Sequence, residues 1–99
     1  AIVTFTSTGS TTLRAARERP NVPILGLTPD IKTARRIMLV WGVHSFKTSY
    51  FDDFDHVVTS AIDVARNEAF AKKGQQLVIT AGVPFGTPGA TNVLRIVKL

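Results

Sequence analysis

The sequence contains no cysteine and only two histidines, which excludes several kinds of site at the start. A chain without cysteine forms no disulfide and no thiolate metal site, and this composition is compatible with a reducing compartment. The imidazoles of His44 and His56 lie in no HExxH motif, and this argues against a metal site built on histidine.

Long apolar runs are also missing. No apolar stretch approaches the roughly 20 residues that a membrane-spanning helix needs, and the chain shows no signal-peptide pattern. We therefore expect no membrane partner.

Runs of one charge are missing as well, although the net charge is +5. No five basic residues are consecutive, and no aromatic side chains interleave with them as a base-stacking surface requires. We interpret them as solvated helix faces and expect no nucleic-acid partner. The basic residues of the predicted helices are Arg14, Arg17, Arg19, Lys32, Arg35, Arg36, Arg66, Lys72 and Lys73.

The 99 residues are enough for one small domain, and a hydrophobic content of 44% with 19% charged residues is typical of a globular protein. No internal repeat, low-complexity segment or linker divides the chain. It opens on Ala-Ile-Val without an initiator methionine, so we expect a piece of a longer protein.

Strand and helix patterns alternate along the chain. Apolar or alternating segments predict strands, and apolar residues at three- and four-residue spacing predict helices. Gly26, inside a buried strand, indicates a close approach by a helix, and Gly42 closes the second helix. The strands are expected at 1–5, 24–27, 43–47, 76–80 and 92–98, and the helices at 11–19, 28–41 and 52–70. The second helix would bury Ile31, Ala34, Met38 and Trp41.

These elements predict a three-layer α/β fold. Helical crossovers make the first four strands parallel, whereas no helix separates the last two, which are therefore antiparallel. With the first strand central, the five-stranded mixed sheet has the order 3-2-1-4-5, with the 43–47 strand at an edge. Ligands of such sheets bind beyond the carboxyl ends of the strands where the order reverses. Residues 6–12 and 81–91 leave the sheet there.

The first of these segments, Thr6–Thr12, is rich in hydroxyl groups and contains Gly9. A small-residue turn at the start of a helix presents backbone N–H groups to an anion, and phosphate is the natural occupant. An alternative remains open, in which Thr8 or Ser10 only caps the helix.

Catalytic motifs are not found. Neither GxxxxGK[ST] nor GxGxxG occurs, and Ser10 or Thr11 as a nucleophile has no base assigned to it. Asp52, Asp53 and Asp55 suit the start of the third helix better than a Mg²⁺ cluster.

Several motifs together resemble the C-terminal domain of pyruvate kinase, and the forms LTP, WGV and AGVPFGTPGATN are most similar to bacterial members. The resemblance covers essentially all 99 residues. The motifs are a TxTGxT turn, RP-x-x-PI-x-x-LTP, TAR-x-x-x-x-x-WGV, KKG-x-x-LVITAG and G-x-x-x-GTPGATN-x-L-R.

This resemblance implies a cytoplasmic enzyme, commonly a homotetramer, that transfers phosphate from phosphoenolpyruvate to ADP with Mg²⁺ and K⁺. The catalytic groups of the family lie in a barrel domain, with a lid domain above it, so the resemblance implies that residues 1–99 alone are inactive and hold no cofactor. The family's domain also begins with a helix ahead of the first strand. Without that helix one sheet face is partly bare, and we expect marginal stability or self-association.

The family's C-terminal domain carries an allosteric effector pocket and contributes to the tetramer interface. Members that respond to fructose 1,6-bisphosphate have a Trp and an Arg where this chain has Tyr50 and Val57, and this chain has Ser7 and Ser10 at turn positions that those members may fill with basic residues. We therefore expect a monophosphate, such as a sugar phosphate or AMP. The resemblance places the phosphate on Thr6, Ser7, Thr8, Gly9, Ser10 and Thr11, with Gly86, Thr87, Pro88 and Gly89 closing over it.

Two other functions remain open. A stand-alone module would bind a phosphorylated metabolite without a parent enzyme. A structural assembly domain would pair its last strand with a partner subunit through the exposed edge that carries Val93, Leu94, Ile96 and Val97.

Overall fold

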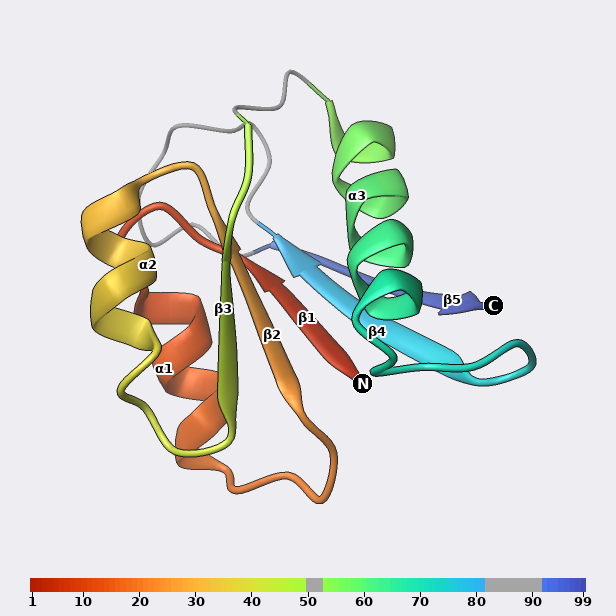
Figure 1. Ribbon diagram of the computed structural model, residues 1–99, viewed down its shortest axis with the longest axis horizontal. Coiled ribbons are helices and arrows are strands. Elements are labelled where there is room, and N and C mark those ends of the chain that lie inside the picture. The colour runs from red at the N-terminus through yellow and green to blue at the C-terminus, as the bar shows by residue number, and fades with distance from the viewer. Residues whose placement is uncertain (50–52, 82–91) are drawn as a thin grey trace.

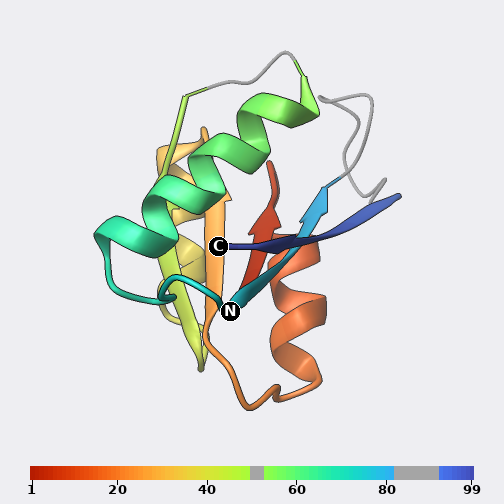
Figure 2. The same cartoon turned by 90° about the vertical axis from the view of Figure 1, so that its right-hand side faces the viewer.

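A mixed β-sheet runs through the middle of the molecule, with helices on both of its faces (Figures 1 and 2). The computed structural model describes residues 1–49, 53–81 and 92–99. In this part of the chain the sheet has five strands in the order β3-β2-β1-β4-β5, and only the β4–β5 pair is antiparallel. The predicted fold class, strand order and edge position of the third strand are confirmed. The elements are β1 (Ile2–Phe5), α1 (Ser10–Arg17), β2 (Ile24–Thr28), α2 (Ile31–Ile37), β3 (Val43–Lys47), α3 (Phe54–Asn67), β4 (Gln76–Ala81) and β5 (Val93–Lys98).

The helices divide the sheet into two unlike faces. In Figure 1, α1 and α2 lie to the left of the sheet and α3 lies to the right. Successive side chains of a strand point to opposite faces, so β1 sends Val3 toward α3 and Thr4 toward α1. The core under α3 consists of Val3, Leu25, Leu27, Val57, Val58, Ala61, Ala65, Ala71, Leu77 and Ile79. The smaller core under α1 and α2 consists of Ala16, Ile24, Ile37 and Val43.

Gly26 brings both helices of the smaller core close to the sheet. A Cβ atom at this position would lie 2.7 Å from Ile37 Cδ1 and 3.4 Å from the side chain of Thr12. The expected close approach is confirmed. The contact fixes α1 and α2 over the centre of the sheet.

The second helix is shorter than predicted. It ends at Ile37 instead of Trp41, because the N–H groups of Leu39 and Val40 bond to carbonyls only three residues back. Gly42 then turns at a φ of 77° and the chain enters β3. As a result Met38 and Trp41, predicted on the buried face, are each 61% exposed, and Ile31 is 43% exposed.

The third helix confirms the acidic start signal. Asp53 is its N-cap, with the carboxylate accepting the His56 N–H at 3.0 Å, and Asp55 lies in the first turn. The helix ends at Asn67 instead of Phe70, since Ala69 adopts a left-handed φ of 60°. Asp52 lies outside the described residues.

Candidate anion-binding site

The turn after β1 lies at the carboxyl end of the sheet and is held from both sides. The Thr6 N–H donates to the Leu27 carbonyl of β2 at 2.9 Å, and Thr6 Oγ1 accepts the Gly9 N–H at 2.8 Å. Gly9 has a φ of 96°, a left-handed conformation that L side chains rarely adopt. The chain therefore reverses at Gly9 and starts α1 directly.

The capping interpretation of this turn is wrong for both residues that it named. The N-cap of α1 is Gly9, with no side-chain cap bond. Thr8 Oγ1 instead donates to Ser10 Oγ at 3.3 Å, and Ser7 and Thr8 are exposed to solvent. The hydroxyls of Thr8 and Ser10 therefore pair with each other, and the Thr6 hydroxyl holds the N-cap residue through the Gly9 N–H.

The start of α1 leaves N–H groups directed out of the helix. Its first internal bond runs from the Leu13 N–H to the Gly9 carbonyl at 2.9 Å. The Ser10 N–H lies ahead of that bond, at the start of the helix, where the dipole is positive. The Ser10 hydroxyl accepts from Thr8 and keeps its own proton, so this hydroxyl and the Ser10 N–H can both donate to an anion.

Helix α2 braces the turn from the side. Thr33 Oγ1 donates to the Ser7 carbonyl at 2.8 Å, and the Arg36 guanidinium donates to the Thr8 carbonyl. Both carbonyls therefore already accept a hydrogen bond from α2. A Cβ atom on Gly9 would lie 3.6 Å from the Arg36 guanidinium, so a positive charge lies beside the turn.

Thr33 and Arg36 were not found by sequence reasoning, which interpreted Arg36 as part of a solvated helix face. One signal was present in the sequence. Thr33, Arg36 and Ile37 have the i, i+3, i+4 spacing of a single helix face. Ile37 packs at the Gly26 contact, so the other two point toward the neighbouring turn.

The second segment predicted at this site is only partly placed. The register pairs Thr4 of β1 with Thr80 of β4, so β4 ends at Ala81 at the same edge of the sheet as the turn. The closing residues Gly86, Thr87, Pro88 and Gly89, and also Tyr50, lie outside the described residues. Val57 is fully buried in the core under α3 and brings no charge to the candidate site.

The described residues do not gather metal ligands. Within residues 1–49, 53–81 and 92–99, no group of three or more His, Asp or Glu side chains could hold a metal ion. The His44 ring lies 4.6 Å from that of Phe70, while His56 lies 3.6 Å from the Asp53 carboxylate. In the same residues, none of the helices has the length and apolar character to cross a membrane.

Comparison with known proteins connects this geometry to a family. The family model "Pyruvate kinase, alpha/beta domain" matches residues 1–97. A pyruvate kinase of Methylorubrum extorquens is 48% identical over 97% of this chain and 20% of its own length. Pyruvate kinases of Geobacillus stearothermophilus and Clostridium acetobutylicum are 38% and 36% identical, each over 97% of this chain, which spans 16% and 20% of their lengths.

This chain thus spans at most about a fifth of these curated relatives, and the region that it matches is their C-terminal domain. The match runs through the turn after β1 and through both faces of the sheet. The chain therefore belongs to the pyruvate kinase family and corresponds to its C-terminal α/β domain.

Proposed function

We propose that this chain is the regulatory and oligomerisation domain of a pyruvate kinase and binds a phosphorylated effector on the turn Thr6–Thr11. The whole enzyme would transfer phosphate from phosphoenolpyruvate to ADP in the cytoplasm. One observation carries the proposal: α1 starts at Gly9 in the turn with no side-chain cap, while the Ser7 and Thr8 carbonyls of the turn already accept hydrogen bonds from Thr33 and Arg36 of α2. A phosphate needs such a set of donors with no acceptor opposing it.

The charge at this turn favours a monophosphate. Residues 6–11 contain no Lys or Arg, so the positive potential comes from the α1 dipole and from Arg36. Val57 supplies no charge for a second phosphate. Because the turn and position 57 supply no cationic side chain, we propose a sugar monophosphate or AMP over a bisphosphate.

Catalysis belongs to the rest of the enzyme in this proposal. The family implies Mg²⁺ and K⁺ in the full-length enzyme, and the described residues of this chain hold no group of three or more His, Asp or Glu side chains that could bind a metal ion. This domain would act on the reaction only by changing the conformation of the domains joined to it.

The assembly part of the proposal rests on β5. This strand is an edge strand within the described sheet, and Leu94 and Ile96 are 65% and 60% exposed on it. An apolar edge strand pairs readily with another chain, which suits a homotetramer. A purely structural assembly domain would use the same strand without any effector, so binding and assembly need separate tests.

Calorimetry on the full-length enzyme tests effector binding. Ser10→Glu puts a carboxylate among the donors of the turn, and Thr59→Glu puts the same charge on the exposed side of α3 as a matched control. We expect AMP or glucose 6-phosphate to bind the wild type and the control. Ser10→Glu should weaken binding by at least about tenfold, which corresponds to about 1.4 kcal/mol.

Two outcomes would contradict this proposal. Tight binding of fructose 1,6-bisphosphate without a response to monophosphates would overturn the choice of ligand. Equal affinities in Ser10→Glu and Thr59→Glu would show that the ligand binds elsewhere. Loss of the tetramer on alteration of β5, with effector binding intact, would separate assembly from regulation.

A further inference from the structure

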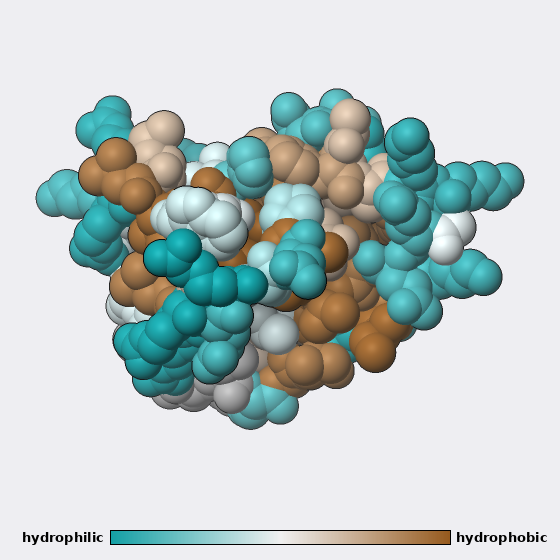
Figure 3. Space-filling model, turned by 90° about the horizontal axis from the view of Figure 1, so that it is seen from below, coloured by the Kyte–Doolittle hydropathy of each residue, from teal (hydrophilic) through white to brown (hydrophobic). Residues whose placement is uncertain are grey.

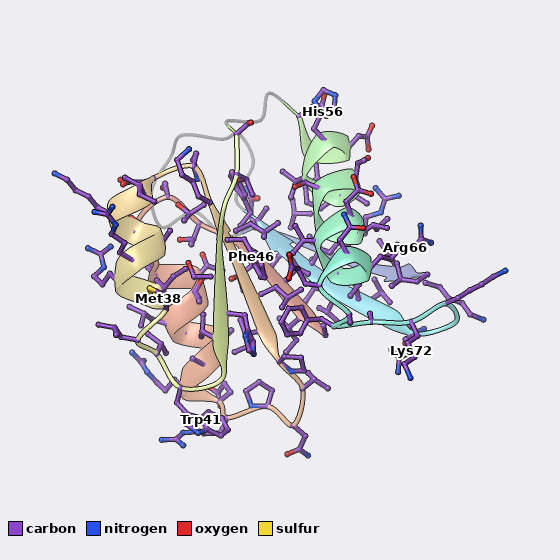
Figure 4. All side chains as sticks on the ribbon, in the orientation of Figure 1. Met38, Trp41, Phe46, His56, Arg66 and Lys72 are labelled. Atoms are coloured by element: carbon purple, nitrogen blue, oxygen red, sulfur yellow. The ribbon has the colours of Figure 1, made fainter. Side chains whose placement is uncertain are left out.

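The guanidinium of Arg36 is held in an unusual way for a surface arginine. It donates to the Thr8 carbonyl of the turn, 28 positions away along the chain, although the residue is exposed to solvent. Arg19 is a contrast, since its guanidinium lies 4.7 Å from the centre of the Trp41 ring. Figure 4 shows Trp41 at the lower end of the molecule, and Figure 3 views that end, where apolar groups lie between hydrophilic ones. Arg19 thus packs on an aromatic ring, whereas Arg36 reaches a backbone carbonyl at the carboxyl end of the sheet.

No carboxylate of the described residues neutralises Arg36. In this part of the chain ion pairs form near the start of α3, at Asp53 and Asp55, and not on α2. Asp30, at the start of α2, uses its carboxylate to accept N–H groups of that helix. A guanidinium bonded to a neutral carbonyl keeps its full charge and has further N–H groups to donate. Arg36 can therefore bind an anion without giving up its bond to Thr8.

This charge lies beside the proposed phosphate position. A Cβ atom on Gly9, the N-cap of α1, would lie 3.6 Å from the Arg36 guanidinium. Ser10 is the next residue, and its N–H and hydroxyl are the donors described above. Charges are screened over about 8 Å at physiological ionic strength, so an anion bonded to Ser10 would be strongly attracted to Arg36.

The residues around Arg36 on α2 hold the helix against the turn. Ile37 Cγ2 would lie 3.0 Å from a Cβ atom on Gly9, and Thr33 Oγ1 donates to the Ser7 carbonyl at 2.8 Å. The guanidinium therefore extends from a backbone that is fixed on both sides of it. A side chain that is already held loses less conformational freedom when a ligand binds.

We infer that Arg36 binds the phosphate of the effector directly and selects a phosphate monoester over a diester. The inference rests on the proposed function, because it names a further ligand contact at the same turn. Guanidinium groups bind phosphate oxygens through strong charge-assisted hydrogen bonds. A monoester has a second ionisation with a pKa of about 6 and is largely doubly charged at neutral pH, whereas a diester carries one charge. The attraction to Arg36 is therefore stronger for a monoester.

Calorimetry on the full-length enzyme with AMP and glucose 6-phosphate tests the contact. Arg36→Gln removes the charge but keeps an N–H donor for the Thr8 carbonyl. Arg35→Gln removes the same charge from the next residue of α2, which is exposed, and is the matched control. We expect Arg36→Gln to weaken binding by about tenfold, as for the loss of a hydrogen bond to a charged group, and the control to change it by less than about twofold. Wild-type enzyme should also bind AMP at least about tenfold more tightly than 3′,5′-cyclic AMP, a diester with the same base and sugar.

The salt dependence of AMP binding separates a direct contact from a bracing role. Arg36→Gln should reduce this dependence, because salt screens the attraction that the variant lacks. Thr33→Val removes the other hydrogen bond from α2 to the turn without removing a charge, so it should keep the wild-type salt dependence. Arg36→Lys keeps the charge and should restore most of the dependence.

The outcomes distinguish this inference from the proposed function. If neither monophosphate binds the wild type, the proposed function fails and the inference fails with it. If both bind, and Ser10→Glu weakens them, equal affinities in Arg36→Gln and Arg35→Gln would overturn the inference alone. Weaker binding by Arg36→Gln with unchanged salt dependence would make Arg36 only a brace of the turn. Equal affinities of the wild type for AMP and cyclic AMP would overturn the preference for a monoester.

Discussion

The two faces of the sheet are built from the same strands but by different means. Under α3 the strands contribute large aliphatic side chains, including Leu77 and Ile79, that are completely buried. Under α1 and α2 the central positions are Thr4 and Gly26, and the helices approach the backbone closely. The α3 face is stabilised by buried apolar surface area. The α1/α2 face buries less apolar area, because its small side chains let two helices and the turn between β1 and α1 lie close to the sheet.

The difference has a consequence at the edge of the sheet. Helices α1 and α2 lie over β1, β2 and β3, so the same face of β4 and β5 is left with Ile96 and Leu94 exposed. The α3 face shows no such gap at β4, where Leu77, Ile79 and Ala81 are all buried. The expected partly bare face is thus located, and the expected marginal stability stays a prediction.

The α3 face should be the most sensitive to loss of volume. Ile79→Ala empties a fully buried position and should lower the free energy of unfolding of the 99-residue chain by about 2–5 kcal/mol. Ile96→Ala, on the exposed part of the opposite face, should cost less than about 1 kcal/mol. Urea unfolding followed by circular dichroism measures both. Equal losses of unfolding free energy in the two variants would mean that the stability of the chain does not depend more on the α3 face than on the exposed part of the opposite face.

The α1/α2 face should be the most sensitive to added volume. Gly26→Ala places a methyl group 2.7 Å from Ile37 Cδ1 and should cost about 1–3 kcal/mol. Ile37→Val removes that Cδ1 atom, so the double variant should lose less than the sum of the single variants. Additive losses in urea unfolding would show that α2 does not approach the sheet through this contact.

The hydroxyl pair between α1 and β1 should have a smaller effect. Thr12 Oγ1 lies 2.7 Å from Thr4 Oγ1, and both residues are completely buried. Thr12→Val leaves the Thr4 hydroxyl without this partner and should cost about 1–2 kcal/mol. Thr12→Ser keeps the bond and is the matched control. The double Thr4→Val/Thr12→Val variant should recover part of the loss. If it recovers none, the two hydroxyls do not stabilise the fold as a hydrogen-bonded pair.

The sequence was sufficient for the strand order but not for the ends of the helices. Alternation and the absence of a helix between β4 and β5 determine the topology, and Gly26 reports the helix approach directly. The end of α2 could not be predicted, because Met38 and Trp41 continue the apolar spacing for a reason outside the helix. Their periodicity therefore does not describe a buried face.

The candidate site was also only partly predictable from the sequence. Thr6, Gly9 and the start of α1 follow from local sequence, since a strand, a small-residue turn and a helix are consecutive. The bracing of the turn by Thr33 and Arg36 comes from residues 26 and 28 positions away along the chain. Such contacts depend on how α2 packs, and composition alone assigned Arg36 to solvent.

The smallest predicted effect concerns Thr80 of β4, on the α1/α2 face of the sheet. Its hydroxyl is buried and has no hydrogen-bond partner in the described part of the chain, whereas the neighbouring Thr4 hydroxyl is paired. Burying a hydroxyl without a partner costs free energy, so Thr80→Val should raise the stability of the 99-residue chain by up to about 1 kcal/mol. The control is Thr4→Val, which should lower it. Thermal unfolding at matched concentrations measures both. If Thr80→Val were destabilising, the hydroxyl would have a partner in solution, and β4 would contribute a polar contact to this face of the sheet.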